Sequence, residues 1–184
     1  MNRRLFIQLP LLASALVADA KNQPAAKLKK GFKVEANRNR HQEELLIMGG
    51  QFDCKVSGKD TNGDLCIYDT FRHEKGGPPL HLHHSQDELF YVIKGEFMAK
   101  VGNDIFNLKP GDTAFAPRTI PHTFAKTSEG EAQMLILFQP AGSMEDFFKQ
   151  ISKLGKNIPK EQEHKLKALY EAHGMQIVGP PLQV

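Results

Sequence analysis

The chain has 184 residues, and its 24 Lys and Arg against 21 Asp and Glu give a formal net charge of +3. This length corresponds to about one domain, and the small, scattered positive excess argues against a nucleic-acid partner. A hydrophobic content of 40% allows a buried core, and two Cys are too few for a disulfide scaffold. No apolar stretch reaches the roughly 18 residues of a membrane-spanning helix, so we expect no membrane span.

The first 20 residues have the composition of an export signal. Two Arg precede an apolar stretch over residues 5–18, and small residues at its end form a cleavage site after Ala20. The run over residues 2–7, NRRLFI, resembles the twin-arginine signal, which carries folded proteins. We therefore expect export to the periplasm and a mature chain from about Lys21. The alternatives are an ordinary secretory signal and a fortuitous amphipathic N-terminus, and an unused signal would leave the protein cytoplasmic.

The next two regions differ in pattern. Residues 21–43 are polar and lack periodicity, which predicts a linker or an arm over the domain surface. Over residues 44–140, short apolar runs alternate with clusters of Gly, Pro, Asn and Asp, which predicts an all-β sandwich or barrel rather than a parallel sheet. We expect strands within residues 45–56, 65–72, 89–101, 105–108, 113–117, 122–127 and 132–140.

Residues 141–184 are predicted to add a short helical extension. A first helix should begin after Ser143, which can cap it, and end at Gly155. A second should begin at residue 159 or 160 and end at Gly174, and the tail over residues 175–184 can lay an extended segment against the domain. The apolar face of the first helix comprises Met144, Phe147, Phe148, Ile151 and Leu154.

Histidine placement carries the chemical information in this sequence. His81 and His83 lie two apart on an expected strand, so both side chains leave the same face. Glu88 follows a turn over residues 84–87 that can bring its carboxylate back to the same site. His122 begins another expected strand. Together these residues offer three imidazole nitrogens and one carboxylate.

This ligand set predicts one bound divalent transition metal. Imidazole and carboxylate suit iron, manganese, nickel, copper or zinc, so the identity of the metal stays open. Four protein ligands leave one or two positions for water, substrate or dioxygen. His81 and His83 alone would be weak evidence, because they could be exposed loop residues after Pro79, but the complete spacing argues for a metal.

Two segments carry a family resemblance. GGPPLHLHHSQDELFYVIKGE, residues 76–96, resembles the first motif of the cupin family, and PGDTAFAPRTIPHTF, residues 110–124, resembles the second. The resemblance spans about residues 45–140 and implies a double-stranded β-helix, the cupin or jelly-roll barrel, with the metal near one end. Residue by residue, it carries metal ligation onto His81, His83, Glu88 and His122.

The chain departs from the cupin motifs at three positions. Thr119 replaces the usual Gly of the second motif, and Lys126 replaces the usual Asn after the final His. Lys75 stands where the first motif opens with Gly, but Gly76 and Gly77 can serve the same turn. These positions belong to turns and to the strand beyond the last ligand, so they weaken an inference about substrate more than one about metal.

The first motif and the short helical tail resemble quercetin 2,3-dioxygenase-like proteins. This implies an oxygenase for a small phenolic or enolic substrate, in which Glu88 is both a ligand and the catalytic proton acceptor. A metal-dependent isomerase or decarboxylase and a non-catalytic small-molecule-binding barrel are the alternatives. No nucleophile elbow, phosphate loop or nucleotide fingerprint is present in the sequence.

The strand after Glu88 is apolar on both faces. Phe90 and Val92 share the face of Glu88, whereas the opposite face needs a cover. The N-terminal arm, the helices or a second subunit could supply it, and we expect a homodimer. The residues of that opposite face are Leu89, Tyr91 and Ile93.

Several remaining residues are expected to be structural. His84 points away from its neighbours, and we expect it at the surface, with Gln86 and Asp87 solvated in the turn. Surface positions are also expected for His41, His73, His164 and His173. Core positions are expected for Phe97, Phe106, Phe115, Phe124 and Phe138.

The two cysteines lie in consecutive expected strands. A symmetric hairpin centred near Asp60 would place Cys54 opposite Cys66, and an exported protein could keep a disulfide there. A one-residue change of register would separate them, and free Cys is a common small core residue. We favour two free core thiols over a bond.

Overall fold

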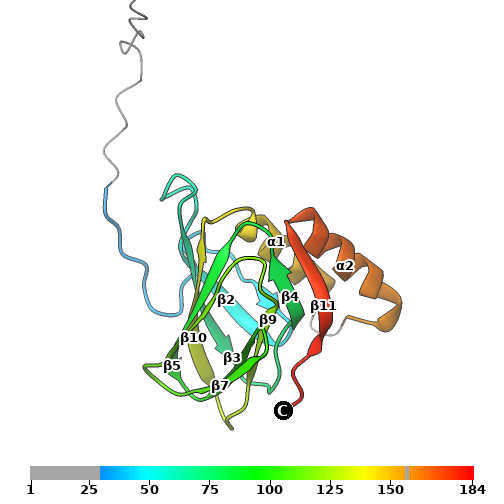
Figure 1. Cartoon of the computed structure of the whole chain (residues 1–184). Coiled ribbons are helices and arrows are strands. Elements are labelled where there is room, and N and C mark those ends of the chain that lie inside the picture. The colour runs from blue at the N-terminus through cyan, green and yellow to red at the C-terminus, as the bar shows by residue number, and fades with distance from the viewer. Residues whose placement is uncertain (1–29, 156–157) are drawn as a thin grey trace, which may run out of the picture. The chain divides into compact units, whose positions relative to one another are not determined.

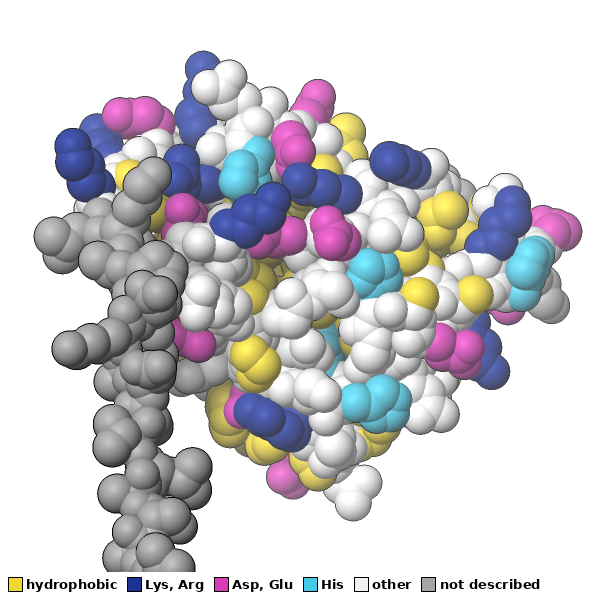
Figure 2. Space-filling model, turned by 90° about the horizontal axis from the view of Figure 1, so that it is seen from above, with side chains coloured by type: hydrophobic (Ala, Val, Ile, Leu, Met, Phe, Trp, Pro, Cys, Tyr) yellow, Lys and Arg dark blue, Asp and Glu magenta, His cyan; other side chains and the backbone are white. Residues whose placement is uncertain are grey.

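The computed structural model describes residues 30–155 and 158–184. The expected export signal, residues 1–20, and the arm up to residue 29 lie outside the described residues. Residues 32–184 form one compact unit. Within the described ranges, every helix is too short or too polar to cross a membrane. Basic and acidic side chains are interspersed on the face seen in Figure 2.

Two antiparallel sheets face each other and form the barrel (Figure 1). The larger sheet has six strands in the order β1 (Leu46–Ile47), β2 (Gly50–Val56), β3 (Cys66–Arg72), β10 (Ala132–Gln139), β5 (Asp87–Lys94) and β8 (Thr113–Ala116). The smaller sheet has five, in the order β11 (Met175–Pro181), β4 (Pro79–His83), β9 (His122–Lys126), β6 (Phe97–Val101) and β7 (Asp104–Leu108). The predicted all-β double-stranded β-helix is confirmed, and the tail adds β11 beside β4.

The hairpin of β2 and β3 does not bring the two cysteines opposite each other. Cys54 pairs with Tyr68, and a register shift between Cys54 and Val56 interrupts the ladder. Cys66 instead pairs with Phe138 on β10. The symmetric hairpin is therefore wrong, whereas the preferred expectation of two free, buried thiols is confirmed. Burial raises the pKa of Cys54 to about 12, so this thiol stays protonated.

The C-terminal extension contains the two expected helices, α1 (Met144–Ile151) and α2 (Glu163–Ala172). Short 3₁₀ turns follow α1 and precede α2, at Ser152–Leu154 and Lys160–Gln162. Ser143 does not cap α1 with its side chain, because its hydroxyl bonds to Nδ1 of His173 at 2.9 Å. His173 is only 9% exposed, so the expectation that it lies at the surface is wrong.

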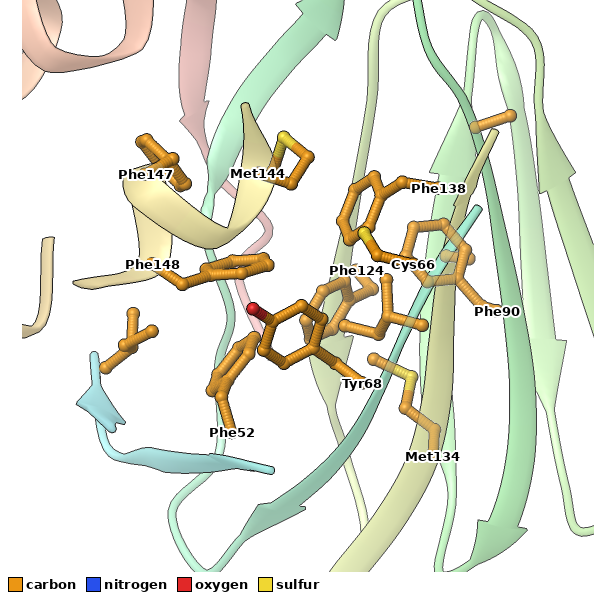
Figure 3. Close-up of a cluster of buried hydrophobic side chains, with 14 of the residues drawn as sticks. Phe52, Cys66, Tyr68, Phe90, Phe124, Met134, Phe138, Met144, Phe147 and Phe148 are labelled. Carbon is orange, nitrogen blue, oxygen red and sulfur yellow. The ribbon is translucent and has the colours of Figure 1, made fainter. Parts of the chain in front are cut away.

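Helix α1 closes one end of the barrel with its apolar face (Figure 3). The ring of Phe148 lies 5.1 Å from that of Phe52 and 4.6 Å from that of Tyr68. The Tyr68 pair is edge-on, a geometry that adds stability beyond the area that the rings bury. Of the five Phe expected in the core, Phe97, Phe124 and Phe138 are buried. Phe106 and Phe115 are 43% and 55% exposed, so for these two the expectation is wrong.

Two of the departures from the cupin motifs, at Lys75 and Lys126, are accommodated by their surroundings. Gly76 has φ +98°, and a Cβ on Gly77 would lie 1.7 Å from the carbonyl oxygen of Phe124. These two glycines therefore serve the turn before β4, as expected beside Lys75. Lys126 is buried on β9, where its Nζ donates to the carbonyls of His73 and Ser128.

Thr119 has φ +68°, a left-handed conformation that a β-branched residue rarely adopts. Replacing it with Gly should raise the free energy of unfolding by about 0.5–1 kcal/mol. The left-handed region costs an L-residue roughly 1–2 kcal/mol, of which the extra chain entropy of Gly cancels roughly 0.5–1 kcal/mol. Urea unfolding of Thr119→Gly measures the change.

Thr127→Gly is the matched control, because Thr127 has no positive φ. This variant should lose at least about 0.5–1 kcal/mol, because it bears the entropy cost of Gly and also loses the contacts of the half-buried Thr127 side chain. Equal losses in both variants would show that the Thr119 backbone is not strained.

Candidate metal centre

Three strands from both sheets position the four expected ligands. His81 and His83 alternate on β4, so both side chains point into the barrel. His122 begins β9 and pairs directly with His81 across the smaller sheet. Glu88 lies at the start of β5 in the larger sheet, after the turn that follows His83. The structure therefore brings together residues that lie up to 41 positions apart in the sequence.

The ligand atoms of these four side chains lie within 4.8 Å of one another, and all four residues are buried. The ring centroids of His81 and His122 are 4.8 Å apart, and the rings of His83 and His122 stack with an interplanar angle of 3°. Three imidazoles and one carboxylate at this spacing can hold one metal ion.

Backbone carbonyls orient two of the imidazoles. Nδ1 of His81 lies 2.9 Å from the carbonyl oxygen of Pro79, and Nδ1 of His122 lies 2.8 Å from that of Ile120. A carbonyl only accepts, so each Nδ1 carries the hydrogen. When neutral, each ring then directs the lone pair of Nε2 into the cluster. This is the arrangement of metal-binding histidines.

Glu88 is the electrostatic centre of the cluster. Burial raises the pKa of this carboxyl, but contacts with His122 and His83 outweigh it and hold the pKa below its usual range. Burial lowers the pKa of His122, but Oε2 of Glu88, 2.8 Å from its Nε2, reverses this and raises it. Burial, with the charge of His122, lowers the pKa of His81 to about 3, so this ring is neutral.

The residues fit a cation. Both ring nitrogens of His83 are buried and have no hydrogen-bond partner among the described residues. Nε2 of His83 does lie 3.2 Å from Oε2 of Glu88, but the two atoms are not aligned for a hydrogen bond. An unpaired buried nitrogen is costly, and a metal ion would satisfy it.

A small cavity of about 40 Å³ adjoins the cluster. Its wall includes His81, His83 and Glu88 and the aromatic side chains of both helices. Tyr170 on α2 meets the ring of His81 edge-on at 5.4 Å and that of Phe147 on α1 at 4.9 Å. The helices therefore cover the site, which the sequence pattern of the extension did not indicate.

The turn between β4 and β5 differs in part from expectation. His84 is exposed, as expected. Gln86 is buried, so the expectation that it is solvated is wrong. Its amide lies against Gly142, where a Cβ would come within 1.9 Å of Nε2. Asp87 pairs with Arg118 at 2.7 Å.

The faces of β5 are as expected, because Phe90 and Val92 are buried beside Glu88 whereas Tyr91 and Ile93 are exposed. Phe90 packs edge-on against His122, with centroids 6.3 Å apart. Phe90 therefore contacts the cluster through the ring of His122.

The remaining histidines lie away from this centre. His41, His73 and His164 are exposed, as expected. Nε2 of His41 lies 3.3 Å from Oε2 of Glu145, and together with Cys54 these two residues form a second group of close ligand types. The Glu145 carboxylate already accepts hydrogen bonds from Ser57 Oγ and the Gly58 N–H.

Arg72 borders the same cavity and was not among the expected site residues. The alternation of residues along β3 could have indicated it. Arg72 continues the inward face that begins with Cys66, Tyr68 and Thr70, all of them buried. A charged residue in phase with a core face points inward. Only the fold shows that this end of β3 reaches the cavity.

Comparison with known proteins identifies relatives of the barrel. Residues 70–138 match the cupin domain family. The uncharacterized protein MJ1618 of Methanocaldococcus jannaschii is 30% identical over 67 residues, which cover 36% of this chain and 54% of that protein. The match thus spans about half of that relative's length.

Solved structures share the architecture. The polyketide cyclase RemF of Streptomyces resistomycificus is similar with a TM-score of 0.51 and 15% identity, over 60% of this chain and 80% of that chain. KdgF of a Halomonas species has a TM-score of 0.48 and 24% identity, over 55% and 89% of the two chains. At this identity the likeness to RemF concerns the fold and not the reaction. With the two-sheet topology and both motifs in place, residues 70–138 are similar to the cupin domain family, and the barrel has the cupin fold.

Proposed function

We propose that this protein is a metal-dependent cupin in which His81, His83, Glu88 and His122 hold one divalent transition metal. The observation that carries the proposal is the buried convergence of three imidazoles and one carboxylate beside a cavity. Iron, manganese, nickel, copper and zinc all suit these donors. A bound metal would supply Lewis acidity at this site and, if redox-active, a place for dioxygen.

For the reaction, we favour a dioxygenase acting on a small phenolic or enolic substrate. The first motif and the helical tail resemble quercetin 2,3-dioxygenase-like proteins, and this resemblance supports the choice. Glu88 is the proposed acceptor of the proton of a substrate hydroxyl, because it is the one carboxylate in the cluster. Apolar side chains of α1 and α2 line part of the cavity, and an apolar surrounding strengthens electrostatic interactions inside it.

Two other functions use the same residues. A metal-dependent isomerase or decarboxylase would need no oxygen, and a binding barrel would hold its ligand unchanged. The fold does not choose between them, because one barrel hosts many reactions.

Removing any one of the three histidines should strip the metal. His81→Ala, His83→Ala and His122→Ala should each lower metal affinity by at least about tenfold, since a strong bond and the site geometry are lost. Elemental analysis of the purified variants measures this. His84→Ala is the matched control and should keep its metal, because His84 is exposed one position away. Metal loss in His84→Ala together with retention in His83→Ala would contradict the ligand assignment.

Oxygen consumption separates the candidate reactions. The metal-loaded protein should take up oxygen with one of a panel of flavonols and dicarbonyls, and Glu88→Gln should lower the rate at least about 100-fold through loss of the proton acceptor. Metal content is measured alongside, because Glu88 is also a proposed ligand. Turnover without oxygen would favour the isomerase or decarboxylase, and unchanged bound ligand would favour the binding barrel.

We also propose that the protein is a homodimer. Tyr91 and Ile93 on the outer face of β5 are 39% and 40% exposed, and Phe115 on the neighbouring β8 is 55% exposed. Tyr91 and Ile93 stay exposed although the two helices are in place, so the cover expected for this face does not come from the extension. A second copy of this face would bury the three side chains together.

Light scattering at tens of micromolar should therefore give twice the monomer mass. Phe115→Lys should shift the protein to the monomer, because a buried unpaired charge opposes association. Val178→Lys is the control, since Val178 is a similarly exposed apolar residue on β11, in the other sheet. A monomeric mass for the unsubstituted protein would rule out the dimer.

A further inference from the structure

Arg72 is a buried cation at the edge of the metal-centre cavity. It ends β3 on the inward face, and only 3% of its surface is exposed. Its guanidinium carbon lies 5.9 Å from the centre of the Phe124 ring. Arginine is rarely buried to this extent unless its donors are paired.

The guanidinium is only partly satisfied. Nη2 donates to the carbonyl of Met48, but Nε is buried and has no hydrogen-bond partner within the described part of the chain. Burial lowers the pKa of Arg72 to about 10, and attraction to Glu74 only partly offsets this. A charged donor left unpaired away from water is costly, so it calls for an explanation.

Lys126 shows that this barrel can satisfy a buried cation. Lys126 is the last residue of β9, and its Nζ donates to two backbone carbonyls, those of His73 and Ser128. Arg72 has one such bond and a buried Nε without a partner among the described residues, and its side chain lines the cavity. A purely structural role for Arg72 would explain the bond to Met48 but not the unpaired Nε.

The charges around the cavity are unbalanced. Among the described residues that line it, Arg72 and Glu88 alone carry a full charge, and most of the others are apolar. Glu88 is already engaged with His83 and His122. A bound divalent cation would therefore leave this apolar cavity with an excess of positive charge, which an anionic ligand would offset.

We propose that Arg72 recognises the carboxylate of a small organic acid that binds in this cavity. Guanidinium and carboxylate match in charge and in planar geometry, and Nε with an Nη can donate to both oxygens of one carboxylate. The inference rests on the proposed function in one respect, namely that the acid is the substrate of the metal centre.

The acid must displace side chains to enter. The cavity of about 40 Å³ is only slightly larger than the share of one water molecule, roughly 30 Å³. Met48 lies between this cavity and an outer groove of about 520 Å³, because it lines both. The groove is lined mainly by apolar side chains of α2 and β11, among them Leu166 and Ile177. Movement of Met48 would therefore open a path from the groove to Arg72.

The test compares acids with uncharged analogues of the same shape. Pyruvate, butyrate and succinate, with the methyl esters of the first two, are titrated into the metal-loaded protein by calorimetry. At least one acid should bind, with its ester bound at least about tenfold more weakly. Arg72→Gln should lower acid affinity by about 10- to 100-fold, the loss expected for hydrogen bonds to a charged group, and should leave ester affinity and metal content unchanged.

Two further variants complete the design. Lys94→Gln removes one exposed positive charge from β5 and should not change acid affinity. Arg72→Lys keeps the charge and should retain a preference for acids, although with weaker binding than the unsubstituted protein. If Arg72→Gln does not fold, the preference of the unsubstituted protein for acid over ester and the Arg72→Lys titration decide the matter.

The outcomes separate this inference from the metal proposal. Equal binding of acid and ester, binding of no acid at millimolar concentration, or an acid preference that survives Arg72→Gln would overturn the role of Arg72, whatever the metal content. Protein that takes up no metal but still binds acids through Arg72 would overturn the metal proposal alone. Acid preference lost with Arg72→Gln in metal-containing protein supports both.

Discussion

The burial of Glu88 between the two sheets is the constraint on which this site depends. A carboxylate enclosed by protein is stable only where nearby charges or hydrogen bonds replace its water, and His122 and His83 do so here. This compensation needs β5 from one sheet to face β4 and β9 from the other. The direct pairing of His81 with His122 sets the spacing of the rings. The barrel therefore places the cluster where both sheets meet.

Helix α1 makes this centre part of the core. Phe148 packs on Phe52 and Tyr68 (Figure 3). Phe147 packs on Tyr170, whose ring in turn meets that of His81 edge-on. The same aromatic contacts thus close the barrel and enclose the metal centre. The side chains that close this end of the barrel therefore also line the cavity beside the cluster.

The two buried cations, Lys126 and Arg72, differ in how their hydrogen-bond donors are paired. Lys126 is held by backbone carbonyls beyond the last ligand, which turns a departure from the cupin motif into a link between β9 and the turn before β4. Arg72 is held by the carbonyl of Met48, lines the cavity, and has a buried Nε without a hydrogen-bond partner among the described residues. The donors of Lys126 are thus paired by the backbone, whereas those of Arg72 are only partly paired.

The sequence by itself determined the all-β class, the strands, both helices and the four residues of the cluster, because alternation, glycine turns and motif spacing are local signals. It also placed His84 outside and Tyr91 on the outer face of β5. The register of the cysteine hairpin, the burial of several side chains and two residues of the site depend on the tertiary structure. The register of β2 and β3 places Cys54 opposite Tyr68 and not opposite Cys66, since a hairpin register depends on pairing along both strands. Phe115 is exposed and Gln86 is buried because edge strands and turns take their burial from distant segments. Arg72 and Tyr170 join the site because β3 and α2, which lie outside both motifs, reach the same cavity, and no local pattern encodes that meeting.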